Sequence, residues 1–263
     1  MTRINEPMMT KVPAVVLAFW VIKICATTAG ETGGDALSMT LGLGYAVSTL
    51  IFLGILIVLL AAQVGARTYH PFLYWGVITS TTTTGTTISD YLDRTLGLGY
   101  PKSSLLLFVA VVGVLGVWHL TTGSISVSRI TTRPAELFYW VAILFSNTLG
   151  TALGDFVSAT SRFGFDGAAV VFGTALSLVG AAYFFSNMSR ASLFWAAFVL
   201  TRPLGATLGD LLTKPHAEGG LHFSRVASSL IIVTAIVVLI VLTDQGAEQG
   251  VTFGAGGRGI DPA

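Results

Sequence analysis

The chain has 263 residues, of which 53% are hydrophobic and only 10% are charged. A soluble domain carries about 25% charged residues, so this composition excludes an ordinary soluble protein and indicates a membrane protein. Fourteen Lys and Arg nearly balance thirteen Asp and Glu, which excludes the basic surface of a nucleic-acid-binding protein, and the single Cys25 excludes an internal disulfide or a cysteine metal cluster.

Long apolar stretches bounded by Gly, Ser, Thr and Arg follow one another along the chain. A helix that crosses the hydrocarbon core needs about 20 mostly apolar residues. Eight such spans are predicted, beginning near Pro13, Tyr45, Phe72, Ser103, Leu137, Gly167, Leu193 and Ser224. We therefore expect an all-α protein with a single transmembrane domain over residues 1–242, a retained first helix, and a disordered Gly-rich tail over residues 243–263.

The basic residues between the spans set the expected orientation. With both termini in the cytoplasm, the inner side holds Arg3, Lys11, Arg67, Arg129, Arg133, Arg190 and Arg258. The outer side then holds Arg94, Lys102, Arg162, Lys214 and Arg225. Seven against five favours cytoplasmic termini under the positive-inside rule.

An internal repeat is the strongest pattern in the sequence. Four residues recur at identical offsets in each copy: Trp20, Gly30, Asp35 and Gly44; Trp75, Gly85, Asp90 and Gly99; Trp140, Gly150, Asp155 and Gly164; and Trp195, Gly205, Asp210 and Gly219. The copies cover roughly residues 13–66, 67–121, 132–187 and 188–242. Each holds two spans, so the repeats are parallel, which predicts pseudosymmetry about the membrane normal, as a four-fold ring or as a pseudo-dimer of hairpin pairs.

An aromatic pair opens each repeat, as Phe19-Trp20, Tyr74-Trp75, Tyr139-Trp140 and Phe194-Trp195. With the Gly and Asp that follow, these pairs resemble a bacterial family of multi-pass membrane proteins made of four tandem two-helix repeats of unknown function. The resemblance covers about residues 15–242 and implies the architecture and a location in the cytoplasmic (inner) membrane of a bacterium, with no settled activity. We interpret the tryptophans as interfacial or packing anchors, and Gly30, Gly85, Gly150 and Gly205 as sites of close helix packing.

A polar stripe precedes each repeated aspartate at helical spacing. The four stripes are Thr27, Thr28, Glu31 and Asp35; Thr82, Thr83, Thr86 and Asp90; Asn147, Thr148, Thr151 and Asp155; and Arg202, Pro203, Ala206 and Asp210. Such stripes cannot face lipid cheaply, so we expect them to face the bundle interior, with the aspartates near the outer boundary. The alternative is structural, with hydroxyls bonded to backbone carbonyls and aspartates that cap or cross-link the hairpins.

Residues confined to one repeat add charge to this interior. Lys23 and Arg202 are each expected to pair with a carboxylate, and Arg202 to neutralise one or two ring aspartates or to lock the first repeat to the last. Together with Glu31 and the four aspartates they predict an interior charge of −3. This charge favours a cation, and carboxylate oxygens suit Mg²⁺ or Mn²⁺ better than copper or zinc. Cys25 is interpreted as a core residue.

These features favour a small secondary transporter or exporter of a cation, coupled to protons, without a cofactor. Its expected partners are the lipid bilayer and a small ion or molecule. One alternative is an intramembrane aspartyl enzyme, although four equivalent carboxylates exceed a dyad and the G-x-G-D pattern of presenilin-type peptidases is absent. Another is a non-catalytic scaffold or sensor. His216, Glu218 and His222 in the last loop lack zincin spacing and are interpreted as exposed loop residues, with an accessory metal site as the alternative.

Overall fold

The computed structural model describes residues 13, 15–66, 68–127, 130, 132–160 and 164–255. Within these ranges the chain forms α-helices with short π and 3₁₀ segments and no β-strand. Six residues used for the predicted orientation lie outside the described ranges: Arg3, Lys11, Arg67, Arg129, Arg162 and Arg258. The predicted tail falls partly on a helix that is described to Ala255 and partly on residues 256–263, which are outside these ranges.

The α-helices of the described ranges each start within four residues of a predicted span. Their bounds are α1 (Leu17–Asp35), α2 (Gly44–Gly65), α3 (Pro71–Asp90), α4 (Tyr100–Thr122), α5 (Arg133–Thr160), α6 (Gly164–Phe185), α7 (Arg190–Thr213) and α8 (Arg225–Ala255). α1 and α3 continue into the π segments η1 (Ala36–Thr40) and η2 (Tyr91–Thr95). The last repeated glycine of each copy has a positive φ, between 65° and 87°, and reverses the chain where a side chain is disfavoured: Gly44, Gly99, Gly164 and Gly219.

Six of these helices are long and apolar enough to cross a membrane: α2, α4, α5, α6, α7 and α8. They indicate a membrane protein. α1 and α3 do not reach this apolarity, although the sequence predicts a span at each. α1 carries Lys23, Glu31 and Asp35 within 19 residues, and α3 contains nine Ser or Thr residues.

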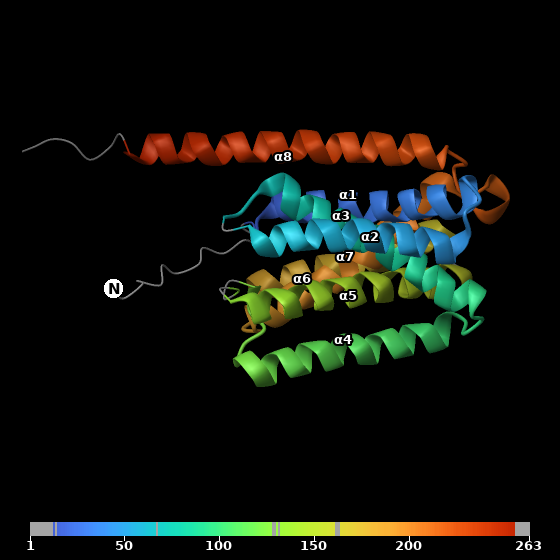
Figure 1. Ribbon diagram of the computed structural model, residues 1–263, viewed down its shortest axis with the longest axis horizontal. Helices are drawn as coiled ribbons and strands as arrows, with labels where there is room; N and C mark the ends of the chain where they lie inside the picture. The colour runs from blue at the N-terminus through green and yellow to red at the C-terminus, as the bar shows by residue number, and fades with distance from the viewer. Residues whose placement is uncertain are drawn as a thin grey trace, which may run out of the picture.

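The odd-numbered helices form a closed inner ring. α1 packs against α3 and α7, and α5 packs against the same two helices (Figure 1). Each even-numbered helix packs on the odd helix of the next repeat: α2 on α3, α4 on α5, α6 on α7, and α8 back on α1. In the most apolar stretches, 67% of α5 and 61% of α7 are buried, against 11–17% of the outer helices. The ring is therefore the core, and the even helices leave most of their apolar surface exposed.

Aromatic side chains close one end of the ring. The Phe or Tyr before each tryptophan contacts the tryptophan of the next repeat, with ring centroids 5.4–6.2 Å apart, in the pairs Phe19–Trp75, Tyr74–Trp140, Tyr139–Trp195 and Phe194–Trp20. The hydroxyls of Tyr74 and Tyr139 also lie 2.6 Å apart. We call these eight residues the aromatic layer. Because it joins the same end of all four odd helices, these helices run in the same direction.

The repeated mid-helix glycines let neighbouring odd helices approach closely. A Cβ at Gly85 would lie 2.9 Å from the backbone nitrogen of Thr148, and a Cβ at Gly205 would lie 2.9 Å from that of Thr28. Gly30 faces Thr82 and Gly150 faces Arg202 in the same way. Each repeat thus packs its glycine on the next, with the last glycine on the first repeat, and any side chain there would push two helices apart.

Candidate functional site

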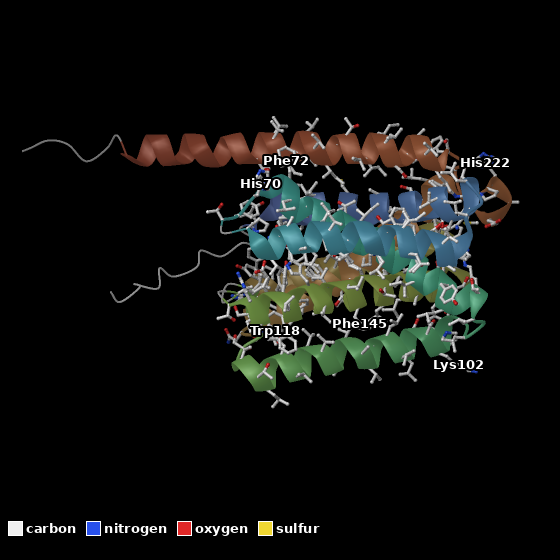
Figure 2. All side chains as sticks on the ribbon, in the orientation of Figure 1. His70, Phe72, Lys102, Trp118, Phe145 and His222 are labelled. Carbon is white, nitrogen blue, oxygen red and sulfur yellow. The ribbon has the colours of Figure 1, made fainter. Side chains whose placement is uncertain are left out.

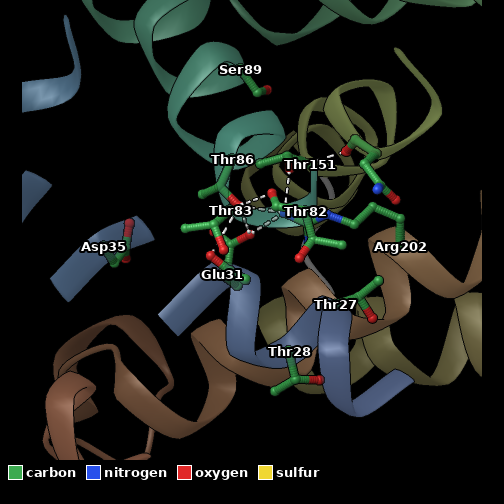
Figure 3. A network of polar contacts seen from close by, with 12 residues as sticks. Thr27, Thr28, Glu31, Asp35, Thr82, Thr83, Thr86, Ser89, Thr151 and Arg202 are labelled. Carbon is green, nitrogen blue, oxygen red and sulfur yellow. Dashed lines mark hydrogen bonds and ion pairs between the residues drawn. The ribbon is translucent and has the colours of Figure 1, made fainter. Parts of the chain in front are cut away.

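A buried ion pair occupies the centre of the ring. Arg202 Nη2 on α7 lies 2.9 Å from Glu31 Oε2 on α1, within hydrogen-bond distance of the Thr86 hydroxyl on α3, and 2.7 Å from Thr151 Oγ1 on α5 (Figure 3). The Arg202 side chain is 0% exposed. One guanidinium nitrogen therefore reaches all four odd helices. Its acidic partner is Glu31, so the expectation that Arg202 neutralises a ring aspartate is wrong, and the alternative, an ion pair that joins the last repeat to the first, is confirmed.

Lys23 contradicts the expectation of a carboxylate partner. Its Nζ donates to Asn147 Oδ1 at 3.1 Å and lies 4.1 Å from the centre of the Phe198 ring. Asn147 Nδ2 in turn donates to Thr81 Oγ1 at 3.0 Å. Glu31 is eight residues further along α1, or about 12 Å of helix, which puts it out of reach. An amide and an aromatic face take the place of the predicted carboxylate.

The hydroxyls of the polar stripes have two different uses. Thr27 Oγ1 lies 3.2 Å from Thr201 O and Thr82 Oγ1 lies 3.1 Å from Ala26 O, so both hydroxyls contact a neighbouring odd helix in addition to a carbonyl of their own helix at 2.8 and 2.7 Å. The neighbouring threonines bond backward to carbonyls of their own helices at 2.9–3.0 Å: Thr28, Thr83 and Thr148. These hydroxyls follow the structural interpretation, whereas Thr86 and Thr151 belong to the Arg202 centre.

The four repeated aspartates lie at the end of the ring opposite the aromatic layer, in two cation-bridged pairs. Lys214 Nζ is 3.0 Å from Asp35 Oδ2 and 3.1 Å from Asp210 Oδ1. Arg94 Nε is 3.1 Å from Asp90 Oδ1, and its Nη2 is 3.5 Å from Asp155 Oδ2. Lys214 therefore joins repeats four and one, and Arg94 joins repeats two and three.

The predicted interior charge of −3 is wrong, because three cations expected in outer loops belong to this network. Arg94 and Lys214 each follow an aspartate by four residues, so they lie on the same helix face, and Arg225 Nε is 3.5 Å from Asp35 Oδ2. With Lys23 and Arg202 they make five cations against the five acids of that count, Glu31 and the four repeated aspartates. In the sequence, the Asp-x-x-x-Arg and Asp-x-x-x-Lys spacing is the pattern from which these two ion pairs could have been predicted.

The Lys214 ammonium stays charged despite its burial. Burial lowers the pKa of Lys214, but the adjacent carboxylates of Asp210 and Asp35 raise it by more, so that it lies above its ordinary value. Asp93 is a further acid that the sequence analysis did not single out. It accepts a hydrogen bond from the Ser103 hydroxyl, and burial raises the pKa of its carboxyl.

Three carboxylates, two on α1 and one on α7, lie close together beside Lys214. One oxygen each of Glu31, Asp35 and Asp210 lies within 4.8 Å of the others, and all three residues are buried. Asp35 Oδ1 has no hydrogen-bond partner among the described residues, although Asp35 is 1% exposed. Carboxylate oxygens at this separation suit a hard cation. The candidate metal ligands are therefore Glu31, Asp35 and Asp210, which include two of the four aspartates.

A cavity of about 570 Å³ opens at the aspartate end and is called the vestibule here. Its wall includes Asp155, Asp210, Arg94, Lys214, Arg225 and Tyr100. Apolar contributions come from Met39, Phe165 and Pro215. The vestibule thus reaches both aspartate pairs, while the aromatic layer closes the far end of the ring.

The last outer loop contributes little to a metal site. Figure 2 shows His222 at the aspartate end of the molecule, where Lys102 also lies. The rings of His216 and His222 have centroids 5.9 Å apart, and His216 Nδ1 is 2.8 Å from Gly220 O. Among the described residues neither histidine joins a cluster of three metal-ligating side chains. Glu218 instead lines the vestibule rim.

Comparison with known proteins confirms the resemblance seen in the sequence. The chain matches the family described as Repeat of Unknown Function (DUF347) over residues 18–69, 73–124, 138–189 and 193–243, one match for each repeat. No curated protein and no solved structure matches the chain. Because the four matches together cover well over half of its 263 residues, the chain belongs to the DUF347 family and carries its repeat four times in tandem.

Proposed function

We propose that the chain is a small secondary transporter in the cytoplasmic membrane of a bacterium. The observation that carries this proposal is a column of buried polar side chains inside the ring, with the vestibule at one end and the aromatic layer at the other. A carrier that exposes its site to one side at a time needs an opening at one end and a closure at the other. A continuous pore would need openings at both ends.

All eight helices cross the bilayer in this proposal. α1 and α3 carry charged or hydroxyl side chains, but the ring and the outer helices enclose their polar faces. Buried polar faces are tolerated at membrane depth. With both termini in the cytoplasm, the vestibule opens to the outside and the aromatic layer lies toward the cytoplasm.

The transported or coupling ion is a cation at Glu31, Asp35 and Asp210, either a proton or a divalent metal such as Mn²⁺ or Mg²⁺. Lys214 now occupies the mouth of this cluster through its ion pairs with Asp35 and Asp210. A cation that binds these oxygens displaces the Lys214 ammonium, because the same carboxylate oxygens cannot bind the cation and the ammonium at full strength together. Binding therefore loosens the contact between α1 and the end of α7, which couples occupancy to helix movement.

The alternative functions have weaker support. An aspartyl enzyme needs two carboxylates that share a proton, whereas each aspartate pair here is bridged by a basic side chain. A scaffold or sensor needs a docking surface, and the connections between the described helices are short. Transport uses the enclosed polar column directly, so we prefer it.

Proteoliposomes test this proposal through Asp35→Asn. We expect the wild-type chain to take up Mn²⁺, Mg²⁺ or protons in response to a pH gradient, and the variant to lose this flux by about tenfold or more, since a neutral amide is a poor cation ligand. Asp166→Asn, at an exposed site on α6, serves as the matched control and keeps the flux.

Two outcomes would contradict the assignment. An Asp35→Asn variant that transports as fast as the wild type removes Asp35 from the ion path. A variant that loses thermal stability while its flux per folded molecule is unchanged assigns Asp35 a structural role.

A further inference from the structure

The vestibule is far larger than a cation requires. Its volume is about 570 Å³, whereas a water molecule occupies about 30 Å³ in the liquid. Pockets for small organic ligands range over about 300–1,000 Å³. The space at the aspartate end therefore fits a small organic molecule beside the ion cluster.

Arg225 offers this molecule an unused guanidinium edge. Its Nε is 3.5 Å from Asp35 Oδ2, and its two terminal nitrogens have no partner among the described residues. The side chain is 20% exposed and lines the vestibule. Arg94 differs, because its three nitrogens already contact Asp90, Asp155 and Tyr45. A planar guanidinium with two free nitrogens binds a carboxylate with two parallel hydrogen bonds.

Two carboxylates in the vestibule wall each have one oxygen that can accept a hydrogen bond from a ligand. Asp155 contacts Arg94 through Oδ2, and Asp210 contacts Lys214 through Oδ1. The other oxygen of each has no ion pair or hydrogen bond to the described residues. Both aspartates line the vestibule and belong to different helices of the ring. Together they form an acceptor site that suits an ammonium group.

We propose that the vestibule binds a small zwitterion of the amino-acid class, which the transporter carries together with its cation. The carboxylate of the solute binds Arg225, and its ammonium binds between Asp155 and Asp210. Its carbon skeleton packs on Met39, Phe165 and Pro215. A zwitterion adds no net charge to a core in which five cations face five acids, so no buried charge is left uncompensated. This inference rests on the proposed transport function, whose substrate it names.

Ligand-induced thermal shifts of the full-length chain in detergent test the solute class. The twenty standard amino acids are screened first. Each that raises the melting temperature is then compared with the acid that lacks its amino group and the amine that lacks its carboxylate. For leucine these are 4-methylpentanoate and 3-methylbutylamine. We expect the zwitterion to bind at least about tenfold more tightly than either, since each charged hydrogen bond contributes about 1.5–3 kcal/mol.

Arg225→Gln tests the site itself. We expect it to weaken binding of the zwitterion by about tenfold or more, while Arg190→Gln, at the opposite end of α7, leaves binding unchanged. If Arg225→Gln does not fold, Arg225→Lys keeps a cation near Asp35 without the planar guanidinium, and the same loss is expected. Size-exclusion profiles establish that the compared variants are folded.

The inference fails if no amino acid stabilises the protein, if the one-charge analogues bind as tightly as the zwitterion, or if Arg225→Gln binds normally. These failures differ from failure of the proposed function. Ion flux that is lost in Asp35→Asn but unaffected by every amino acid would support the transport function and contradict the zwitterion substrate. Binding of a zwitterion without flux of any ion or solute would contradict the proposed transport function.

Discussion

The Arg202–Glu31 pair is the most consequential residue-level feature, because both charges are fully withdrawn from water. Arg202 is 0% and Glu31 4% exposed in their side chains. Two further donors or acceptors, Thr86 and Thr151, complete the contacts of Arg202 Nη2. Desolvation of two such charges cancels much of their attraction, so the pair specifies the arrangement of the four odd helices more than it stabilises them.

Removal of one partner should therefore cost more than removal of both. Arg202→Met leaves Glu31 buried without its cation, and we expect a loss of about 3–5 kcal/mol in the free energy of unfolding. The double change Arg202→Met with Glu31→Gln should recover most of this loss. Thermal melts of both variants in the same detergent measure the difference. A double variant as unstable as the single one would contradict this account.

At this scale the sequence predicts positions better than partners. The helical period correctly places the Glu31, Thr86 and Thr151 positions on the inner face, because one turn repeats every 3.6 residues. It does not reveal that Lys23 binds Asn147 across the ring, since that contact depends on the distance between helices. Arg94 and Lys214 were recoverable from their spacing to the aspartates, but the loops around them favoured an exposed position.

At the scale of elements, the glycine contacts between odd helices fix how closely the ring can pack. The sequence predicts these contacts from the repeated Gly alone, and Gly30, Gly85, Gly150 and Gly205 all face the next odd helix. A second glycine position one turn later is occupied by Gly34, Gly154 and Gly209 but by Ser89 in the second repeat. The sequence did not predict which helix each even helix packs on, because apolar outer surfaces carry no specific pattern.

Gly85→Ala tests the close approach of α3 and α5. The new methyl group would lie 2.9 Å from the backbone nitrogen of Thr148, which cannot move aside without its helix. We expect a loss of about 1–3 kcal/mol in stability. Gly113→Ala on α4 has nothing within 4 Å and is the matched control, with little change expected. Equal melting temperatures for the two variants would contradict the close contact.

At the scale of the whole molecule, the repeats close on themselves. α8 packs on α1 as α2 packs on α3, so the last repeat continues into the first (Figure 1). The sequence left open whether four parallel repeats form a four-fold ring or a pseudo-dimer. The helices follow the four-fold pattern, whereas the bridging cations Arg94 and Lys214, 120 residues apart, occur only in alternate repeats.

A circular permutant tests this closure. A chain that begins at residue 132 and joins residue 243 to residue 15 through about 20 Gly and Ser residues should fold, since such a linker spans roughly 25 Å and both joined ends lie at the same end of the bundle (Figure 1). We expect a monodisperse protein with a melting temperature within a few degrees of the parent. Aggregation of this permutant, while the uncut chain with the same linker appended stays soluble, would contradict the cyclic packing.

Because the bridging cations occur in alternate repeats, they divide the helices at the aspartate end into two groups. Lys214 and Arg225 fasten α1, α7 and α8 together, while Arg94 fastens α2, α3 and α5 through Tyr45, Asp90 and Asp155. No ion pair among the described aspartates crosses from one group of helices to the other; the crossing bonds lie deeper, at Arg202, Lys23 and Thr82. The aspartate end of the ring can therefore widen between α1 and α3 and between α5 and α7, while the deeper bonds hold these helices together and act as the pivot.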